Sequence, residues 1–185
     1  MSGGPAPPRR WSAATIALHW LSAVLVILLL GLGWFMVHAD IGAATKFDLY
    51  QLHKSLGFLS LVFLIARLAA RLGSAAPPGP FTTPLWERRL AGAAHAAFYL
   101  LLLAAALSGW LVVSAAIIPV PTRFFDFVVI PNLTGADAAL EATATVIHYA
   151  ASRLIMALTI VHVAAALKHH FIDRDDVLAR MVRLR

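Results

Sequence analysis

Four long apolar segments constrain the fold of this chain more than any other feature. They are residues 13–35, 51–71, 90–115 and 142–167. An α-helix rises about 1.5 Å per residue, so each segment can cross a hydrocarbon core roughly 30 Å thick. Within lipid, a helix satisfies its backbone hydrogen bonds internally. The sequence therefore predicts an all-α fold, an integral membrane four-helix bundle.

The remaining residues connect or flank these segments. The region 73–83 is rich in proline and glycine, which end helices. Residues 117–141 contain three prolines and an apolar stretch too short to span, so we expect a loop that partly enters the membrane interface. No signal-peptide cleavage pattern follows the first apolar segment, which predicts an uncleaved helix. We expect tails at 1–12 and 172–185 around one domain, 13–171.

The basic residues are distributed unequally around the four segments. The N-terminal tail, the second connection and the C-terminal region hold eleven lysines and arginines against four acids. The other two connections hold Lys46, Lys54 and Arg123 against five acids. Because basic residues favour the cytoplasmic side, this pattern predicts a multi-pass inner-membrane protein with both termini in the cytoplasm. It also accounts for the net charge of +6 without a nucleic-acid partner.

The chain contains no cysteine. Disulfides, iron–sulfur clusters, thiolate-ligated haem and covalent CxxCH haem attachment are therefore excluded. Any metal must depend mainly on histidine, methionine or oxygen ligands.

Histidines within the apolar segments are the main functional signal, because ionisable groups are costly in lipid and usually have a partner. His148 and His162 are 14 residues apart, which places both on one helix face, about 21 Å apart. Alternating helix directions place His19 at the depth of His162, and His53 at the depth of His148. Two imidazoles facing each other suit a low-spin b-type haem. The sequence thus predicts two haems b, one on the cytoplasmic side (His19, His162) and one on the periplasmic side (His53, His148).

Other polar residues could assist these haems or their reaction partners. Arg67 follows His53 by 14 residues and is our candidate for binding the propionates of the cytoplasmic haem. Lys54, Arg123 and Arg153 could bind propionates of the periplasmic haem or attract an anionic reactant. His95 could be a helix-contact residue, a competing ligand or a quinone contact. His169 and His170 could contact a quinone or a propionate, or form a solvated interfacial cluster.

Three stretches together resemble the bacterial cytochrome b561 family. They are RWSAATIALHWL near the start, YQLHKSLGFLSLVFLIARLAARL in the second apolar segment and IHYAASRLIMALTIVHVAAALKHHF in the fourth. The resemblance implies an often dimeric, four-helix dihaem protein of the inner membrane, with ligands at His19, His53, His148 and His162. It also implies oxidation of periplasmic superoxide coupled to reduction of ubiquinone.

Two further hypotheses remain open at this point. Haem subunits of hydrogenases and formate dehydrogenases share the general architecture, so the chain could be a cytochrome b anchor between a partner dehydrogenase and quinone. A third class, a transporter or small-molecule-binding bundle, would use the histidines as a proton relay. Purified protein without haem absorption would favour that third reading.

Overall fold

The computed structural model describes residues 11–73 and 84–182 of the chain. Its four long helices are α1 (Ala13–His38), α2 (Ala43–Leu72), α3 (Leu85–Ala115) and α4 (Ala138–Phe171). Each is long and apolar enough to cross a membrane. The predicted fold class, a membrane bundle of four helices, is therefore confirmed. The predicted linker and most of the predicted N-terminal tail lie outside the described residues.

The helices extend beyond the apolar segments predicted to span the membrane. The helix α2 begins at Ala43 rather than residue 51, and α3 begins at Leu85 rather than residue 90. At the start of α4, the Asp137 side chain accepts hydrogen bonds from the first free backbone N–H groups. Hydropathy marks only the part of a helix that lies in lipid. Capping groups and polar turns decide where the helix ends.

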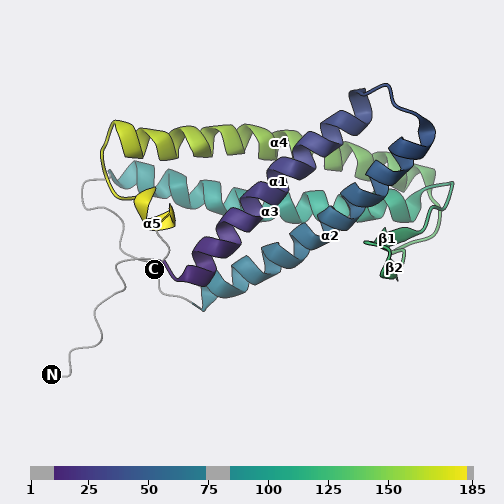
Figure 1. Ribbon diagram of the computed structural model, residues 1–185, viewed down its shortest axis with the longest axis horizontal. Coiled ribbons are helices and arrows are strands. Elements are labelled where there is room, and N and C mark those ends of the chain that lie inside the picture. Colours follow the sequence, from purple (N-terminus) through teal and green to yellow (C-terminus); the bar gives the residue numbers. More distant parts are fainter. Residues whose placement is uncertain (1–10, 74–83, 183–185) are drawn as a thin grey trace.

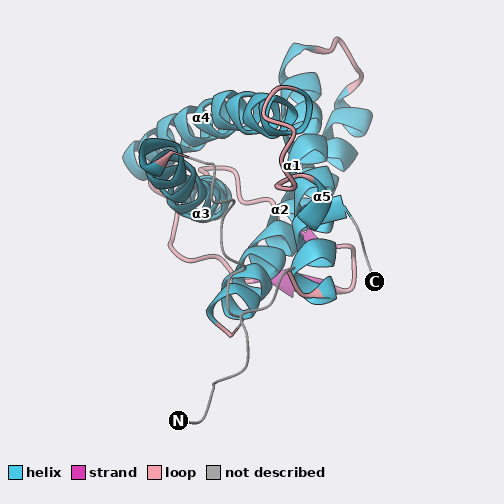
Figure 2. Ribbon diagram, turned by 90° about the vertical axis from the view of Figure 1, so that its left-hand side faces the viewer, coloured by secondary structure: helices cyan, strands magenta, loops and turns pink. Residues whose placement is uncertain are grey.

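The bundle consists of two helix pairs. The helix α1 packs on α2 and α3 packs on α4, while α2 also contacts α3 (Figure 1). Viewed from its end, the bundle shows α3 and α4 together on one side and α1 and α2 on the other (Figure 2). We call the end with Ala13, Leu72, Leu85 and Phe171 the terminal end. The opposite end, with His38, Ala43, Ala115 and Ala138, is called the hairpin end after the β-hairpin described below.

Most large apolar side chains lie on the outside of the bundle. Leu28, Val62, Leu100 and Ile160 are each more than half exposed, as are many of their neighbours. In water such a surface would be unfavourable, but in a bilayer it contacts lipid tails. This exposed apolar surface is therefore suited to a lipid environment.

A short β-hairpin, which the sequence reading did not predict, closes the hairpin end. Strands β1 (Thr122–Phe124) and β2 (Val128–Ile130) pair antiparallel within the region expected to be a loop. Phe125 and Asp126 form its turn with positive φ angles. The Ser55 hydroxyl on α2 donates to the Arg123 carbonyl and accepts from the Phe125 N–H. The hairpin is thereby attached to α2 beside His53.

The C-terminal segment folds against the terminal end rather than extending away as a simple tail. It contains the short helix α5 (Ala179–Val182). The Trp20 indole N–H on α1 donates a 2.6 Å hydrogen bond to the carbonyl of Met181. Arg180 and Asp176 form an ion pair within this segment. This contact could not be predicted from the sequence, because α1 and the C-terminal segment are far apart in the chain and meet only in the folded bundle.

Candidate functional site

A seven-residue spacing places functional side chains along the inner faces of α2 and α4. On α2 the series is His53, Ser60 and Arg67; on α4 it is His148, Ile155, His162 and His169. Seven residues turn an α-helix through about 700°, only about 20° short of two full turns. Members of each series therefore follow one another along one helix face, about 10 Å apart.

The helices α1 and α3 carry matching series. They are His19, Val26 and Gly33 on α1, and His95, Leu102 and Gly109 on α3. A small internal cavity is lined by the middle member of three series, Val26, Ser60 and Leu102, together with Ser22, Leu64 and Arg67. The four series therefore line the interior of the bundle. Their members lie at three heights along the bundle axis, which we call the hairpin-end level, the middle level and the terminal-end level.

The hairpin-end level contains His53 and His148. Their ring centroids lie 6.2 Å apart, with the ring planes at 82°. The two rings come from α2 and α4, so they face each other across the bundle interior. Within the described residues, Nδ1 of His53 is buried without a hydrogen-bond partner.

Two glycines leave room for these rings. A Cβ on Gly109 would lie 3.0 Å from Cε1 of His148, and a Cβ on Gly33 would lie 3.4 Å from Cε1 of His53. The first distance is too short for an unstrained contact, so a side chain at position 109 would displace the imidazole. A Cβ at position 109 would thus fit only if the His148 ring moved by a few tenths of an ångström.

A backbone hydrogen bond orients His148. Its Nδ1 lies 2.8 Å from the carbonyl oxygen of Ala105 on α3. A carbonyl can only accept, so Nδ1 must carry the proton, and Nε2 of the neutral ring is left with a free lone pair. Metal-ligating histidines commonly show this arrangement. The bond therefore leaves Nε2 of His148 available to a metal ion.

The terminal-end level contains three histidines and an arginine. His19 and His162 have ring centroids 6.3 Å apart, and His95 lies on another side of His162 at 5.8 Å. The Arg67 guanidinium is 3.1 Å from Nδ1 of His19 and lies over the ring of Tyr99 at 5.9 Å. This level is therefore more polar and more positive than the hairpin-end level.

The spacing within both pairs fits one shared metal ion. Two imidazole nitrogens on opposite sides of an ion, each about 2 Å from it, would hold their ring centres roughly 6 Å apart. The pairs His53–His148 and His19–His162 lie at 6.2 and 6.3 Å. Together with the glycine spaces and the free Nε2 of His148, this donor set fits b-type haem with two histidine ligands.

The structure places two of the three predicted cationic residues near the hairpin end, but none of them in contact with the His53–His148 pair within the described residues. Lys54 follows His53 directly and is half-buried. Arg123 lies on β1, which is bonded to α2 through Ser55, and its exposed guanidinium is 3.4 Å from Asp126. Arg153 is exposed and five residues from His148, which places it about 140° away around α4. Arg153 therefore does not share the face of the histidines.

The two histidines that end α4 lie in different surroundings. His169 faces inward and contacts Asp175 and Asp173. His170 is exposed and its ring contacts Phe171. Glu87, His169 and Asp173 have ligand atoms within 4.8 Å of one another. However, the Lys168 ammonium lies 3.2 Å from Glu87 and 2.7 Å from Asp173, so a side-chain cation already pairs with both carboxylates.

Sequence reasoning missed three contributors to the hairpin-end level: Gly33, Gly109 and the Ala105 carbonyl. The glycines could have been found, because each stands 14 residues after a histidine, His19 or His95, on the same helix. Such a spacing places a glycine on the face of a histidine, at the depth of the other histidine pair. The role of the Ala105 carbonyl could not have been predicted from the sequence, because every residue has a backbone carbonyl.

Comparison with known proteins identifies one family of membrane cytochromes. The sequence model of prokaryotic cytochrome b561 matches residues 10–184. Cytochrome b561 homolog 2 of Escherichia coli K12 is 38% identical over 177 residues, covering 95% of this chain and 92% of that protein. Cytochrome b561 homolog 1 of the same strain is 27% identical over 94% of this chain and 97% of its own length.

A more distant relative has a named activity. The probable superoxide oxidase CybB of Yersinia pestis is 25% identical, over 94% of this chain and 96% of that protein. Family membership implies a bacterial membrane protein that binds b-type haem and transfers electrons. The bundle, the histidine pairs and the match over nearly the whole length lead to one conclusion: this chain belongs to the prokaryotic cytochrome b561 family.

Proposed function

We propose that the protein is a superoxide:quinone oxidoreductase of the bacterial inner membrane that binds two haems b. The observation that carries the proposal is the presence of two histidine pairs, at opposite depths of one bundle, each spaced for one iron. When bound, the haems would supply two one-electron carriers, one near each membrane surface. Domain 13–171 would form this unit, with the remaining residues as tails.

The residues of each level would bind their haem differently. At the hairpin end, His53 and His148 would be the axial ligands, and the Ala105 carbonyl would hold the His148 ring in place. At the terminal end, His19 and His162 would be the ligands. Arg67 lies beside His19 and would pair with a propionate, because a guanidinium binds a carboxylate through two parallel hydrogen bonds.

The distribution of basic residues supports an orientation with the terminal end in the cytoplasm. Eleven lysines and arginines flank that end, and three flank the hairpin end. The hairpin end would then face the periplasm. Active periplasmic reporters fused after Arg185, combined with inactive cytoplasmic ones, would reverse this assignment.

The anionic electron donor would approach the hairpin end. Lys54 is the neighbour of His53 in the chain, and Arg123 lies on the hairpin bonded to α2 two residues further along. Positive charge at a site mouth raises the encounter rate with an anion such as superoxide. The similarity to the probable superoxide oxidase CybB supports this choice of donor. Arg153, on another face, would contribute less.

The electron acceptor would bind near the terminal end. Isoprenoid quinones dissolve in the hydrocarbon of the membrane, which surrounds the exposed apolar faces of the bundle. His95 lies against His162, and His169 lies on the same face of α4, so both are candidate contacts for a ubiquinone ring. The exposed helix faces also leave room for a second copy of the chain, as in a homodimer.

The proposal is tested by reduction of the purified haem-loaded protein with superoxide at increasing salt. The attraction acts over about 10 Å at 0.1 M salt, so the rate should fall as ionic strength rises. The double variant Lys54→Gln, Arg123→Gln should react more slowly, with a flatter salt dependence. Arg153→Gln is the control and should resemble the parent protein.

The same experiment separates this proposal from the alternative functions. Haems that superoxide does not reduce at any salt, but that a partner dehydrogenase reduces readily, would favour a membrane anchor. Loss of haem from the double variant would instead assign Lys54 and Arg123 to propionate binding. A purified protein without haem would contradict the redox function altogether.

A further inference from the structure

The two histidines of each level belong to different helix pairs. At the terminal-end level, His19 lies on α1 and His162 on α4. At the hairpin-end level, His53 lies on α2 and His148 on α4. The helix pair α1–α2 therefore supplies one histidine to each level, and the helix pair α3–α4 supplies the other.

Contacts within the helix pair α1–α2 position its two histidines. Gly33 on α1 leaves space beside Cε1 of His53 on α2. The Arg67 guanidinium on α2 lies 3.1 Å from Nδ1 of His19 on α1. Each of these histidines is thus contacted by the other helix of its own pair.

The helix pair α3–α4 positions its two histidines in the same way. On α4, Nδ1 of His148 is hydrogen bonded to the Ala105 carbonyl of α3. The ring of His162 lies 5.4 Å from that of Phe98 and 5.8 Å from that of His95, both on α3. The second helix pair therefore also prepares its ligands with its own contacts.

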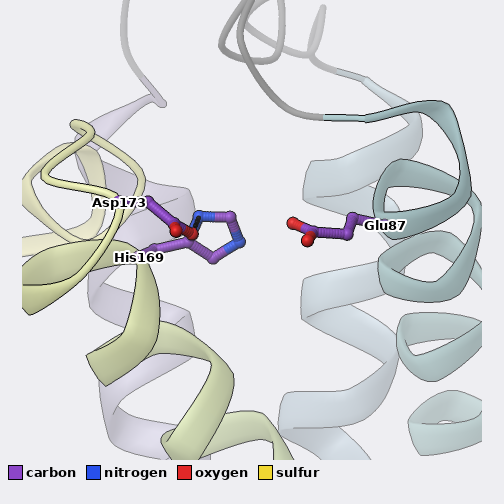
Figure 3. Close-up of side chains that lie close together, drawn as sticks. All are labelled: Glu87, His169 and Asp173. Carbon is purple, nitrogen blue, oxygen red and sulfur yellow. Dashed lines mark ion pairs between the residues drawn. The ribbon is translucent and has the colours of Figure 1, made fainter.

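Ion pairs hold α3 to α4 at the terminal end. Glu87, near the start of α3, points toward His169 and Asp173 at the end of α4 (Figure 3). The Lys168 ammonium lies 3.2 Å from Glu87 and 2.7 Å from Asp173, so it pairs with a carboxylate from each side. Together with the bond from His148, these contacts join α3 and α4 at both levels.

Direct packing between the two helix pairs is concentrated on one side of the bundle. The helix α2 packs against α3, with the rings of Phe58 and Trp110 5.1 Å apart. On the other side, α1 and α4 meet through the rings of His19 and His162. The β-hairpin and the C-terminal segment add hydrogen bonds between the helix pairs at the two ends of the bundle.

Lipid does not press the two helix pairs together. Lipid tails are as apolar as the side chains that they contact, so separating two apolar helix surfaces in a bilayer has little hydrophobic cost. Association then depends on close packing, hydrogen bonds and shared ligands. A ligand bound by residues of both helix pairs would contribute strongly to their association.

We propose that the protein assembles from two preformed helix pairs, and that haem binding joins them along the side where α1 faces α4. This inference rests on haem binding at both levels, as proposed above. Each iron would take one ligand from each helix pair, so free energy of haem binding would also be free energy of assembly. Loss of a haem would loosen this side of the bundle, while each helix pair would keep its own structure.

The test measures distances between spin labels on the full-length protein in lipid nanodiscs, with and without haem. The chain has no cysteine, so two labelled cysteines can be introduced without removing a native thiol. Leu28 on α1, Val62 on α2, Leu100 on α3 and Ile160 on α4 are exposed and suit this purpose. The distance between labels at Leu28 and Ile160 reports on the two helix pairs relative to each other. The distances Leu28–Val62 and Leu100–Ile160 report within one helix pair.

Omission of haem should shift the Leu28–Ile160 distances to longer values and broaden their distribution, measured by double electron–electron resonance. Both distances within a helix pair should stay as they are in the haem-loaded protein. His19→Ala and His53→Ala should each keep one haem and give an intermediate Leu28–Ile160 distribution. His38→Gln is the matched control, because it replaces an exposed histidine outside both levels and should resemble the parent protein.

Two results would overturn the proposal. An unchanged Leu28–Ile160 distribution would show that direct packing suffices to join the helix pairs. Equal broadening of all three distances would show that the helix pairs are not preformed. The two ligand variants give the same decision if haem-free protein cannot be recovered. Either result with a haem-loaded parent would leave the proposed function intact, whereas a parent protein that binds no haem would contradict that function itself.

Discussion

The two histidine levels use different means to prepare similar sites. At the hairpin end, glycines make room for the rings, and a backbone carbonyl orients His148. At the terminal end, no glycine stands at the matching positions of the series. Arg67, His95 and, one step further, His169 surround the pair instead. The first level is built by close packing and the second by charge. Substitutions should therefore affect them differently.

The largest expected effect is loss of one haem per ligand substitution. His53→Ala and His148→Ala should remove the same haem, and His19→Ala and His162→Ala the other. Each variant should retain half the haem, because the remaining level keeps both its ligands. Haem quantitation with reduced-minus-oxidised spectra measures this. His95→Ala is the comparison and should retain both haems. The assignment fails if His95→Ala loses a haem and His19→Ala loses none.

A smaller effect should follow from filling the glycine spaces. Gly109→Ala places a Cβ 3.0 Å from His148, whereas Gly33→Ala places one 3.4 Å from His53. We expect Gly109→Ala to weaken binding of the hairpin-end haem markedly, and Gly33→Ala to weaken it little. Haem retention under mild detergent washing would reveal the order. Gly31→Ala is the control, since nothing lies within 4 Å of its Cβ. Equal retention in all three variants would show that the glycines are not required.

Removing a positive charge at the terminal end should change the reduction potential of the terminal-end haem rather than the haem content. Arg67→Gln removes a cation beside His19, so an added electron is stabilised less. A unit charge about 8 Å away at an effective dielectric constant of 20 contributes on the order of 2 kcal/mol, roughly 90 mV. The terminal-end haem should become harder to reduce by up to that amount. Arg67→Lys should retain most of the parent potential. A shift confined to the hairpin-end haem would contradict the assignment of levels.

The smallest expected effects concern the segments that cover the two ends. Ser55→Ala removes the hydroxyl that bonds both Arg123 and Phe125 of the hairpin. Trp20→Phe removes one bond to Met181. Each net hydrogen bond contributes about 1 kcal/mol, so amide exchange should rise severalfold in the covering segment concerned. Hydrogen exchange by mass spectrometry reports both ends in one experiment. Unchanged exchange at the altered end would show that other contacts hold that segment.

Much of this protein could be predicted before any coordinates. Apolar length alone predicts four spans, since lipid admits few other structures. Helical periodicity places His148 and His162 on one face, and alternating direction suggests their partners on α1 and α2. The structure brings those partners together at 6.2 and 6.3 Å. These features depend on local geometry along a helix, which sequence spacing encodes directly.

Other features depend on which helices meet and at what rotation. The carbonyl of Ala105 that orients His148, the β-hairpin bonded to Ser55 and the acidic cluster around His169 all join residues distant in the chain. Composition does not encode such contacts, because any carbonyl can accept and any exposed carboxylate can remain solvated. The sequence by itself determined the spans and the helix faces that carry the histidines. Only tertiary packing decided which polar groups surround each pair, because that depends on the distances between helices.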